Sequence, residues 1–223
     1  MGETINGCGG ALRIGALASG GGSNLQAIID ACEAGRIDGC VAVVISNNSK
    51  AGALDRARRH GIPTRHLSHA RYPDDADLDR AFVEALREYD VNVVVLAGYM
   101  KKRGPEFLRA FPRRVLNIHP ALLPGPHGGR GKYGIHVHES VLAAGDKVTG
   151  VTIHLVDEEY DHGPVVARRE LPVEDGDTPE TLQRRVLDVE HELYPETLAA
   201  LARGEIDLDA IAAGDEPGDV NGA

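Results

Sequence analysis

The sequence contains no tryptophan, and aromatic residues make up only 4% of its 223 residues. Domains that bind single-stranded nucleic acid stack the bases on aromatic side chains, so this composition disfavours that class. Acidic residues outnumber basic ones by 34 to 24, and the formal net charge is −10. A protein that binds a phosphate backbone needs a basic stripe instead. We therefore expect small-molecule partners and no nucleic acid.

Long apolar runs and a signal peptide are also missing. No stretch of about 18 apolar residues occurs, so we expect no membrane span. Residues 1–10 are polar and glycine-rich, without a basic region followed by an apolar one. The three cysteines, Cys8, Cys32 and Cys40, match no metal or redox spacing. These features predict a reduced, cytoplasmic location.

Hydrophobic content and charge predict the domain organisation. Hydrophobic residues form 42% of the chain, which is enough for one sizeable core. We predict a flexible N-terminus over residues 1–11, a single domain over 12–203 and a tail over 204–223. The tail has six acidic residues and no lysine or arginine, so we expect it to be solvated and disordered.

Short apolar runs alternate with segments of helical periodicity. Such alternation predicts βαβ units and an α/β fold with a mostly parallel sheet. After residue 145, two strands with little between them predict an antiparallel addition. The predicted strands cover 12–18, 40–45, 91–97, 115–118, 148–156 and 165–171. The predicted helices cover 24–34, 51–60, 77–89, 105–111 and 179–202. Pro195 should kink or break the last of these helices.

Three consecutive glycines, Gly20–Gly22, lie between the first predicted strand and the first predicted helix. Glycines let the backbone approach a ligand, and the N–H groups at a helix N-terminus suit a phosphate. Ser23 and Asn24 add polar donors. Leu25 stands where a dinucleotide site needs a third glycine, and the lysine of a P-loop is missing, so a phosphomonoester fits better. The alternative is a tight strand-to-helix turn with an ordinary cap.

Polar residues gather between positions 117 and 162. Asn117 and His119 are two apart on a predicted strand, so they face the same side near its carboxyl end, where parallel sheets bind ligands. Asp161 belongs to an acidic turn between two later strands. An amide can hold an oxyanion, an imidazole can move a proton, and a carboxylate beside it raises its pKa. The combination suits acyl or formyl transfer. No Gly-x-Ser-x-Gly elbow occurs, which disfavours a covalent acyl-enzyme.

A metal site is the competing interpretation of these histidines. The ligands would come from widely spaced positions: His119, His136, His138, His154 and Asp161. No His-Glu-x-x-His motif occurs, and the spacing matches no standard site. For His127, His138 and His162 we expect surface or helix-capping positions.

Five motifs together resemble the glycinamide ribonucleotide formyltransferases, a folate-dependent family of purine biosynthesis. They are SGGGSNLQAI at 19–28, VLAGYM at 95–100, NIHPALLP at 117–124, VTGVTIHL at 148–155 and DEEYDHGPV at 157–165. The resemblance implies a Rossmann-like formyltransferase fold with helices on both faces of the sheet. It implies an enzyme that moves the formyl group of its co-substrate, 10-formyltetrahydrofolate, to the amine of 5′-phosphoribosyl glycinamide. Transfer would be direct, through a tetrahedral intermediate and without a metal, in a monomer or homodimer.

The resemblance also implies roles for individual residues. Asn117 would hold the formyl oxygen, and His119 would donate a proton to the tetrahedral intermediate. Asp161, oriented by His154, would raise the pKa of His119. The acceptor's phosphate and ribose would bind at Gly22, Ser23, Asn24, Leu187, Asp188, Val189 and Glu190. The folate would bind at Met100, Lys101, Lys102, Arg103, Asn117, Asp157, Glu158, Glu159, Tyr160 and Asp161. The Leu123–Pro124 bond would be cis.

Two segments depart from the family pattern, and a third is rich in glycine. Lys102 and Arg103 replace apolar residues of the family pattern, and we expect them to turn outward or to engage the anionic glutamate tail of the donor. Residues 73–75 read Pro-Asp-Asp where the family often has a folate-binding arginine, so that contact is not carried over. The glycine-rich segment 125–138 predicts a mobile loop over the site.

Other functions stay open. One is a formyltransferase that uses a different phosphorylated amine as its acceptor. A methionyl-tRNA formyltransferase carries a further C-terminal domain, and a formyltetrahydrofolate hydrolase carries an N-terminal regulatory domain; we expect neither in this chain. A non-catalytic nucleotide-binding module would use the glycine turn alone. That interpretation leaves Asn117, His119 and Asp161 without a purpose.

Overall fold

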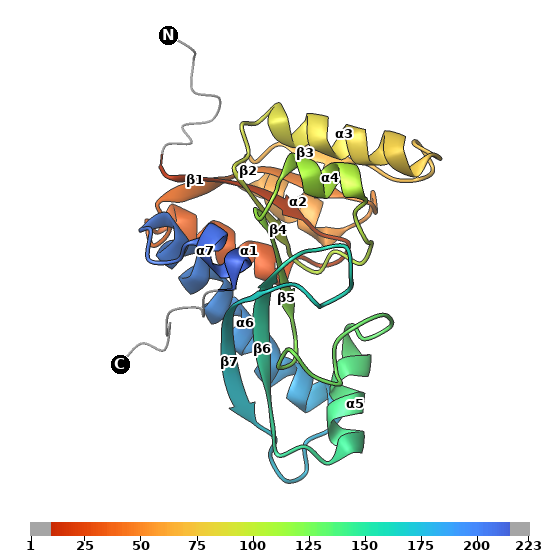
Figure 1. The fold of residues 1–223 in the computed structure, drawn as a ribbon, viewed down its shortest axis with the longest axis vertical. Coiled ribbons are helices and arrows are strands. Elements are labelled where there is room, and N and C mark those ends of the chain that lie inside the picture. The colour runs from red at the N-terminus through yellow and green to blue at the C-terminus, as the bar shows by residue number, and fades with distance from the viewer. Residues whose placement is uncertain (1–9, 215–223) are drawn as a thin grey trace. The chain divides into compact units, whose positions relative to one another are not determined.

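The computed structural model describes residues 10–214, whose contacts group into two compact units that divide between Leu116 and Asn117. The single domain that the sequence predicted over 12–203 stays a prediction. Figure 1 labels the elements of both units.

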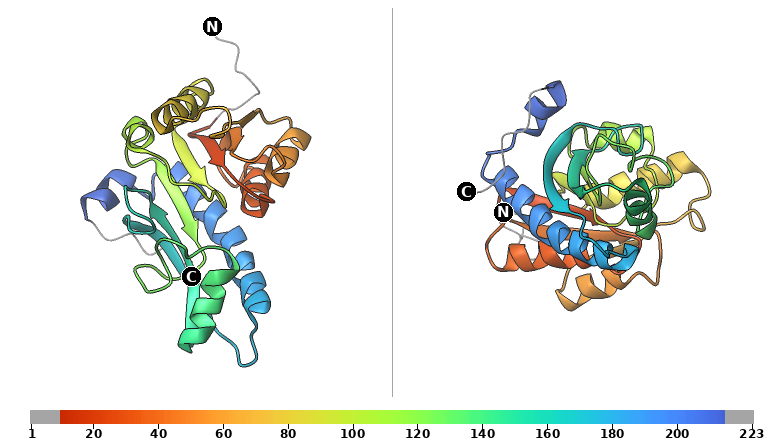
Figure 2. Two further views of the ribbon diagram at one scale, coloured as in Figure 1. Left: turned by 90° about the vertical axis from the view of Figure 1, so that its right-hand side faces the viewer. Right: turned by 90° about the horizontal axis from the view of Figure 1, so that it is seen from below.

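The first unit is a parallel sheet covered by helices on both faces. Its strands are β1 (Leu12–Leu17), β2 (Gly39–Ser46), β3 (Thr64–His66) and β4 (Val93–Leu96). Its helices are α1 (Ser23–Glu33), α2 (Gly52–Arg59), α3 (Asp75–Arg87) and α4 (Pro105–Ala110). β1 pairs in parallel with β2 and β4, and β2 pairs in parallel with β3. Helices α1 and α2 cover one face, and α3 and α4 cover the other (Figure 2).

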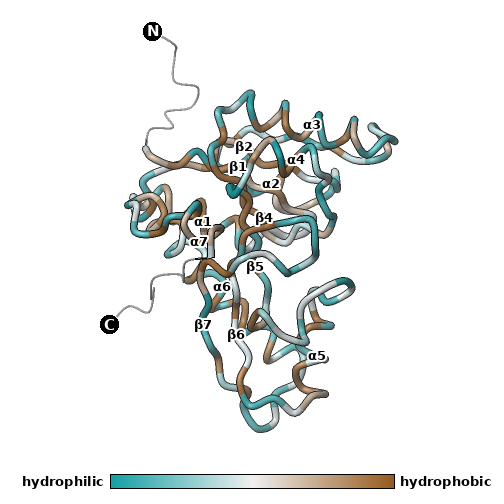
Figure 3. The backbone as a smooth tube through the Cα atoms, in the orientation of Figure 1, coloured by the Kyte–Doolittle hydropathy of each residue, from teal (hydrophilic) through white to brown (hydrophobic). Residues whose placement is uncertain are grey.

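Apolar strands form the core of this unit. All four residues of β4 are buried, as expected for a central strand that is covered on both faces. The tube in Figure 3 is correspondingly brown along β1 and β4, whereas α3 alternates between brown and teal. Gly15 allows α3 to approach β1, since a Cβ there would lie 2.4 Å from the Leu86 side chain. The Asp74 carboxylate caps α3 by accepting from the N–H groups of Ala76 and Asp77.

The second unit contains the antiparallel addition. β5 (Val115–His119) crosses the boundary, and β6 (Val148–Leu155) pairs antiparallel with β7 (Val165–Pro172). The helices are α5 (Ile135–Ala144), α6 (Pro179–Ala202) and α7 (Leu208–Ala213). The strand order is β3-β2-β1-β4-β5-β6-β7. The predicted fold class, a mostly parallel α/β sheet with an antiparallel C-terminal addition, is confirmed.

Helix α6 continues through Pro195, where the sequence predicted a kink or a break. It runs unbroken for 24 residues. A proline inside a helix costs about 3 kcal/mol through one lost hydrogen bond and a steric clash. Here Pro195 lies on the buried face of the helix, which packs on α5, β6 and β7. That packing outweighs the local cost, so the predicted break at Pro195 is wrong.

Two other predictions of irregular structure are wrong in part. The predicted mobile loop 125–138 ends in helix, because α5 begins at Ile135 and buries Val137 and His138. The predicted disordered tail contains helix α7, which buries Leu208 and Ile211. Residues 1–9 and 215–223 of the predicted flexible termini lie outside the described residues. Within residues 10–214, no helix combines the length and the apolar character needed to cross a lipid bilayer.

Candidate active site

The glycine turn that precedes α1 is open where the sequence predicted a phosphate. At Gly20 and Gly21, an added Cβ would meet no atom within 4 Å, so packing does not require glycine at either position. Gly22 is different, because its φ is +75° and a Cβ would lie 2.7 Å from the Ala53 Cβ. Gly22 is also the N-cap of α1, and no side chain caps this helix. Glycine is itself a common N-cap residue, so this cap fits both a phosphate site and a tight strand-to-helix turn.

Arg56 of α2 forms a hydrogen bond to the backbone of this turn, which was not predicted from the sequence. Its Nε donates to the Gly21 carbonyl at 2.8 Å, and its Nη1 donates to the Gln26 Oε1 at 3.2 Å. Ser23 and Asn24 occupy the first turn of α1, where Asn24 is buried and Ser23 is half-buried. Arg56 lies on a separate helix 35 residues after Gly21, so no local motif marks it.

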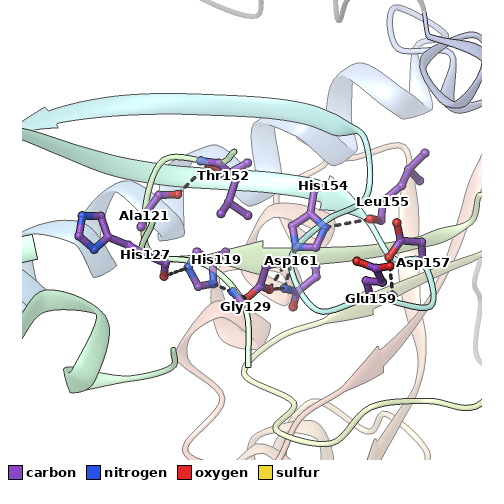
Figure 4. A network of polar contacts seen from close by, with 12 residues as sticks. His119, Ala121, His127, Gly129, Thr152, His154, Leu155, Asp157, Glu159 and Asp161 are labelled. Atoms are coloured by element: carbon purple, nitrogen blue, oxygen red, sulfur yellow. Dashed lines mark hydrogen bonds and ion pairs between the residues drawn. The ribbon is translucent and has the colours of Figure 1, made fainter. Parts of the chain in front are cut away.

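The three residues predicted as catalytic and the supporting His154 lie together in the second unit. Figure 4 labels three of the four: His119, His154 and Asp161. Asn117 and His119 end strand β5, His154 lies near the end of β6, and Asp161 lies in the turn before β7. Asp161 is the centre of the group. Its carboxylate is 3.5 Å from the His119 Nδ1 and 3.6 Å from the His154 Nε2. The sequence therefore identified a real cluster from residues spread over 45 positions.

The ring of His119 is held at both of its nitrogen atoms. Its Nε2–H donates to the backbone carbonyl of His127 at 2.9 Å, and its Nδ1 faces the Asp161 carboxylate. The side chains of His119 and Asp161 are only 4% and 10% exposed. Because Nε2 keeps its hydrogen on a carbonyl, Nδ1 is the nitrogen that can gain and lose a proton.

Burial and charge act in opposite directions on this pair. Burial lowers the pKa of His119; Asp161 and the His127 carbonyl raise that pKa, and the balance remains below the usual value. The predicted effect of Asp161, which raises the His119 pKa, has the expected direction; the sequence did not reveal the burial that outweighs it. Burial raises the pKa of Asp161, but His154, His119 and the Gly129 N–H together hold that pKa below its usual value. Asp161 is therefore a carboxylate at neutral pH.

Asn117 links His154 to Asp161. The Nδ1–H of His154 donates to the Leu155 carbonyl at 2.8 Å, which leaves Nε2 to accept from the Asn117 amide at 3.0 Å. The same amide group donates to the Asp161 Oδ1 at 3.4 Å. The longer bond is the weaker one, so its hydrogen is more easily exchanged for another acceptor.

The turn that carries Asp161 has its own supports. Asp161 has a left-handed backbone with φ of 55°, a conformation that aspartate adopts more readily than most residues. Its Oδ2 accepts from the Gly129 N–H at 2.9 Å. Asp157 accepts from the Glu159 N–H and lies 3.1 Å from the His162 Nδ1. Glu158, Glu159 and Tyr160 are exposed on this turn. His162 is exposed as predicted.

The other segment predicted for folate binding follows β4 in the first unit. Met100, Lys101 and Lys102 are exposed there, with Met100 at 46%. Arg103 turns inward instead. Its guanidinium lies 3.8 Å from the buried Asp79 carboxylate and 4.4 Å from the centroid of the Phe82 ring. The expectation that Arg103 turns outward or meets the tail of the donor is therefore wrong.

The segment predicted for the ribose lies on α6. Glu190 is buried on the same helical stripe as Leu182 and Val186, which are apolar. A buried carboxylate at such a position is unusual and often functional. Leu187 and Val189 are half-buried and Asp188 is exposed.

Two histidines that the sequence placed at the surface are buried. The ring of His127 lies between the side chains of Ser140 and Asp146. His138 is buried near His119, and burial is the main cause that lowers its pKa to about 4. The surface predictions for both are wrong. His136 is exposed beside Glu139, so it does not share an environment with His138. Among the described residues, no three His, Cys, Asp or Glu side chains are grouped to hold a metal ion. The Leu123–Pro124 bond is cis, as predicted.

An α/β sheet that carries an amide, an imidazole and a carboxylate together near the end of a strand indicates a group-transfer enzyme. Comparison with known proteins identifies the family of this enzyme. The chain belongs to the formyl transferase family, which matches residues 12–198. It is 45% identical over 189 residues to the chloroplastic phosphoribosylglycinamide formyltransferase of Arabidopsis thaliana, covering 84% of this chain and 64% of that protein. It is 40% identical to the phosphoribosylglycinamide formyltransferase of Escherichia coli, covering 88% of this chain and 90% of that protein.

Solved structures agree with this assignment. The crystal structure of glycinamide ribonucleotide transformylase 1 from Symbiobacterium toebii matches with a TM-score of 0.82 and 45% identity, covering 91% of this chain and 93% of that one. A formyltetrahydrofolate deformylase from Pseudomonas syringae matches with a TM-score of 0.75 and 26% identity, covering 86% of this chain and 62% of that one. The family resemblance found in the sequence is confirmed.

Proposed function

We propose that this protein transfers the formyl group of 10-formyltetrahydrofolate to the amine of 5′-phosphoribosyl glycinamide, a step of purine biosynthesis. One observation carries the proposal: the buried pair of His119 and Asp161, with Asn117 beside it, at the end of β5. The relatives named above support the choice of substrates. Deformylation of 10-formyltetrahydrofolate that depends on the added ribonucleotide tests it.

The chemistry follows from the positions of the three side chains. The acceptor amine adds to the formyl carbon, whose C=O electron pair moves onto the oxygen. The Asn117 amide stabilises this oxyanion as the hydrogen bond to Asp161 is exchanged for one to the substrate. The Nδ1 of His119 takes a proton from the new ammonium group and donates it to N10 of the folate as the C–N10 bond breaks. Asp161 stabilises the imidazolium formed in between.

The substrate subsites are part of the same proposal. The open space at Gly20 and Gly21 and the glycine N-cap of α1 support phosphate binding by Gly22, Ser23 and Asn24. The buried carboxylate of Glu190 supports an interaction with a ribose hydroxyl. The exposed residues Glu158, Glu159 and Tyr160, between Asp157 and Asp161, and the exposed side chains of Met100, Lys101 and Lys102 support folate binding. Arg103 contributes no side chain to that subsite.

Replacing Ser23 with alanine tests the phosphate subsite. A hydrogen bond to a charged group is worth about 1.5–3 kcal/mol, so we expect the KM for the ribonucleotide to rise roughly tenfold or more. The kcat should change much less, because the phosphate is remote from the reacting carbon. Steady-state kinetics with the acceptor varied gives both constants. Ser49→Ala, at an exposed position after β2, is the matched control. A loss confined to kcat would contradict the phosphate assignment.

A hydrolase that cleaves 10-formyltetrahydrofolate is the second candidate. The likeness to the deformylase from Pseudomonas syringae favours it specifically. Water would then replace the amine as the nucleophile, and deformylation would proceed without the ribonucleotide. The absence of a metal from the reaction, the cytoplasmic location and the monomeric or dimeric state stay predictions.

A further inference from the structure

A second polar network in the second unit is centred on His127, whose backbone carbonyl contacts His119. The ring of His127 is buried, and its Nε2 lies 2.6 Å from the Asp146 Oδ2. Its Nδ1 lies 3.0 Å from the Ser140 Oγ, which accepts from the Lys132 Nζ at 2.9 Å. These residues come from the glycine-rich segment 125–134, from α5 and from the turn before β6. None of them is in the set predicted for catalysis or binding.

The donors and acceptors of this network form one consistent chain. The Lys132 ammonium can only donate, so the Ser140 Oγ accepts from it and is free to donate its own hydrogen to the His127 Nδ1. The His127 Nε2–H then donates to the Asp146 carboxylate. Both ring nitrogens of His127 therefore have a hydrogen-bond partner. The side chain therefore anchors the backbone of residue 127 to α5 and to the turn that follows it.

The backbone beside this anchor contacts both members of the catalytic pair. The carbonyl of His127 accepts the Nε2–H of His119 at 2.9 Å. Two residues later, the Gly129 N–H donates to the Asp161 Oδ2 at 2.9 Å. Figure 4 shows the ring of His119 between these two contacts. One short segment thus holds the imidazole and the carboxylate at the same time.

Glycine makes this close approach possible, and it also makes an anchor necessary. A Cβ on Gly128 would lie 2.5 Å from the Leu123 side chain and 3.3 Å from the Asp161 Cβ, and Gly129 has a φ of +95°. Only glycine fits such positions without strain, yet glycine loses the most conformational entropy on ordering. The segment has little intrinsic order of its own. The buried ring of His127 supplies the fixed point.

We propose that His127, held by Asp146 and Ser140, is a positioning residue that keeps the hydrogen of His119 on Nε2 and so presents Nδ1 to Asp161. The proposal rests on the formyltransferase function proposed above, because His119 and Asp161 act through that reaction. His127 itself contacts no reacting atom in this assignment. Its effect on the rate passes through the tautomer and the placement of His119.

The first test weakens the anchor without touching the catalytic pair. Asp146→Ala and Ser140→Ala each remove one partner of His127. A misplacement of about 1 Å can cost about a hundredfold in rate, so we expect kcat to fall at least tenfold with both KM values within twofold. Asp146→Asn keeps an oxygen that can accept from Nε2–H, so it should recover much of the loss. Glu139→Ala breaks the exposed His136–Glu139 pair of the same helix and should match the wild type.

The second test reads the tautomer of His119 directly and needs no turnover. Long-range ¹H–¹⁵N correlation spectra distinguish Nδ1–H from Nε2–H, and a His119→Gln variant assigns the signal. The wild type should show His119 as the Nε2–H form, and Asp146→Ala should shift it toward a mixture. Melting curves confirm that the variants are folded; if Asp146→Ala does not fold, Ser140→Ala carries the test.

The two tests separate the proposals. If the variants keep the His119 tautomer of the wild type and the kcat of the Glu139→Ala control, the role of His127 is overturned. This holds whichever reaction the protein catalyses. The wild type could be inactive and still show His119 in the Nε2–H form, with a shifted tautomer in the variants. That result overturns the proposed function alone and supports the positioning role of His127. If the wild type is active and the variants show both a lower kcat and a shifted His119 tautomer, the proposed function and the role of His127 are both supported.

Discussion

Replacing Asp161 with asparagine is expected to lower kcat by about 10²-fold or more, within the range that general acid–base catalysis contributes. The amide has the same shape as the carboxylate and can still accept from the Gly129 N–H. It has no charge to stabilise the imidazolium of His119, which lies 3.5 Å away. Since burial already disfavours that cation, the loss of Asp161 removes the main group that opposes burial.

Single-turnover kinetics with both substrates saturating isolates the chemical step of this variant. Asp55→Asn is a suitable control, because Asp55 is an exposed residue of α2 that pairs with Arg58. We expect it to react at the wild-type rate. A folded Asp161→Asn variant with the wild-type kcat would remove Asp161 from the mechanism.

Replacing Arg103 with leucine, the residue type of the family pattern, is expected to destabilise this protein by about 3–5 kcal/mol. The guanidinium and the Asp79 carboxylate are 4% and 6% exposed, so removing one partner leaves the other charge buried. Asp79 keeps its hydrogen bonds from the Gly104 and Phe107 N–H groups, which prevents it from turning to solvent. Loss of the cation that stacks on Phe82 adds to the cost.

Chemical denaturation of four proteins measures this effect. Arg103→Leu should lower the free energy of unfolding, and the double variant Asp79→Asn/Arg103→Leu should regain part of it, because the buried charge is then gone. Arg80→Leu is the control, since Arg80 is 53% exposed and a surface ion pair contributes about 0–1 kcal/mol. An Arg103→Leu variant as stable as the wild type would show that the buried pair contributes nothing.

The elements that depend on local patterns could be predicted from the sequence. The strand at 93–96 is four buried apolar residues, and the helix at 75–87 has a clear apolar stripe with a capping aspartate. The strand at 64–66 was missed because its three residues, Thr-Arg-His, have no apolar signal; it forms by pairing with β2. Helix α5 was missed because the glycines before it suggested a longer loop.

The candidate site divides in the same way. Asn117 and His119 share a strand, so their common face follows from the two-residue period. The partners of His127 could not be predicted, because Asp146 and Ser140 reach it only through the path of the segment 125–134. The inward turn of Arg103, which lies in the loop before α4, depends on Asp79, 24 residues earlier on α3. Contacts of this kind depend on tertiary structure, which no local motif records.

The central claim is that this chain moves a formyl group from folate to a phosphorylated amine. The direct test mixes the protein with 10-formyltetrahydrofolate and glycinamide ribonucleotide, in the presence of EDTA, and follows the appearance of the deformylated folate. A parallel reaction omits the ribonucleotide. The account predicts deformylation and a formylated ribonucleotide only when the acceptor is present. Equal deformylation without the acceptor, or none in either reaction, would contradict it.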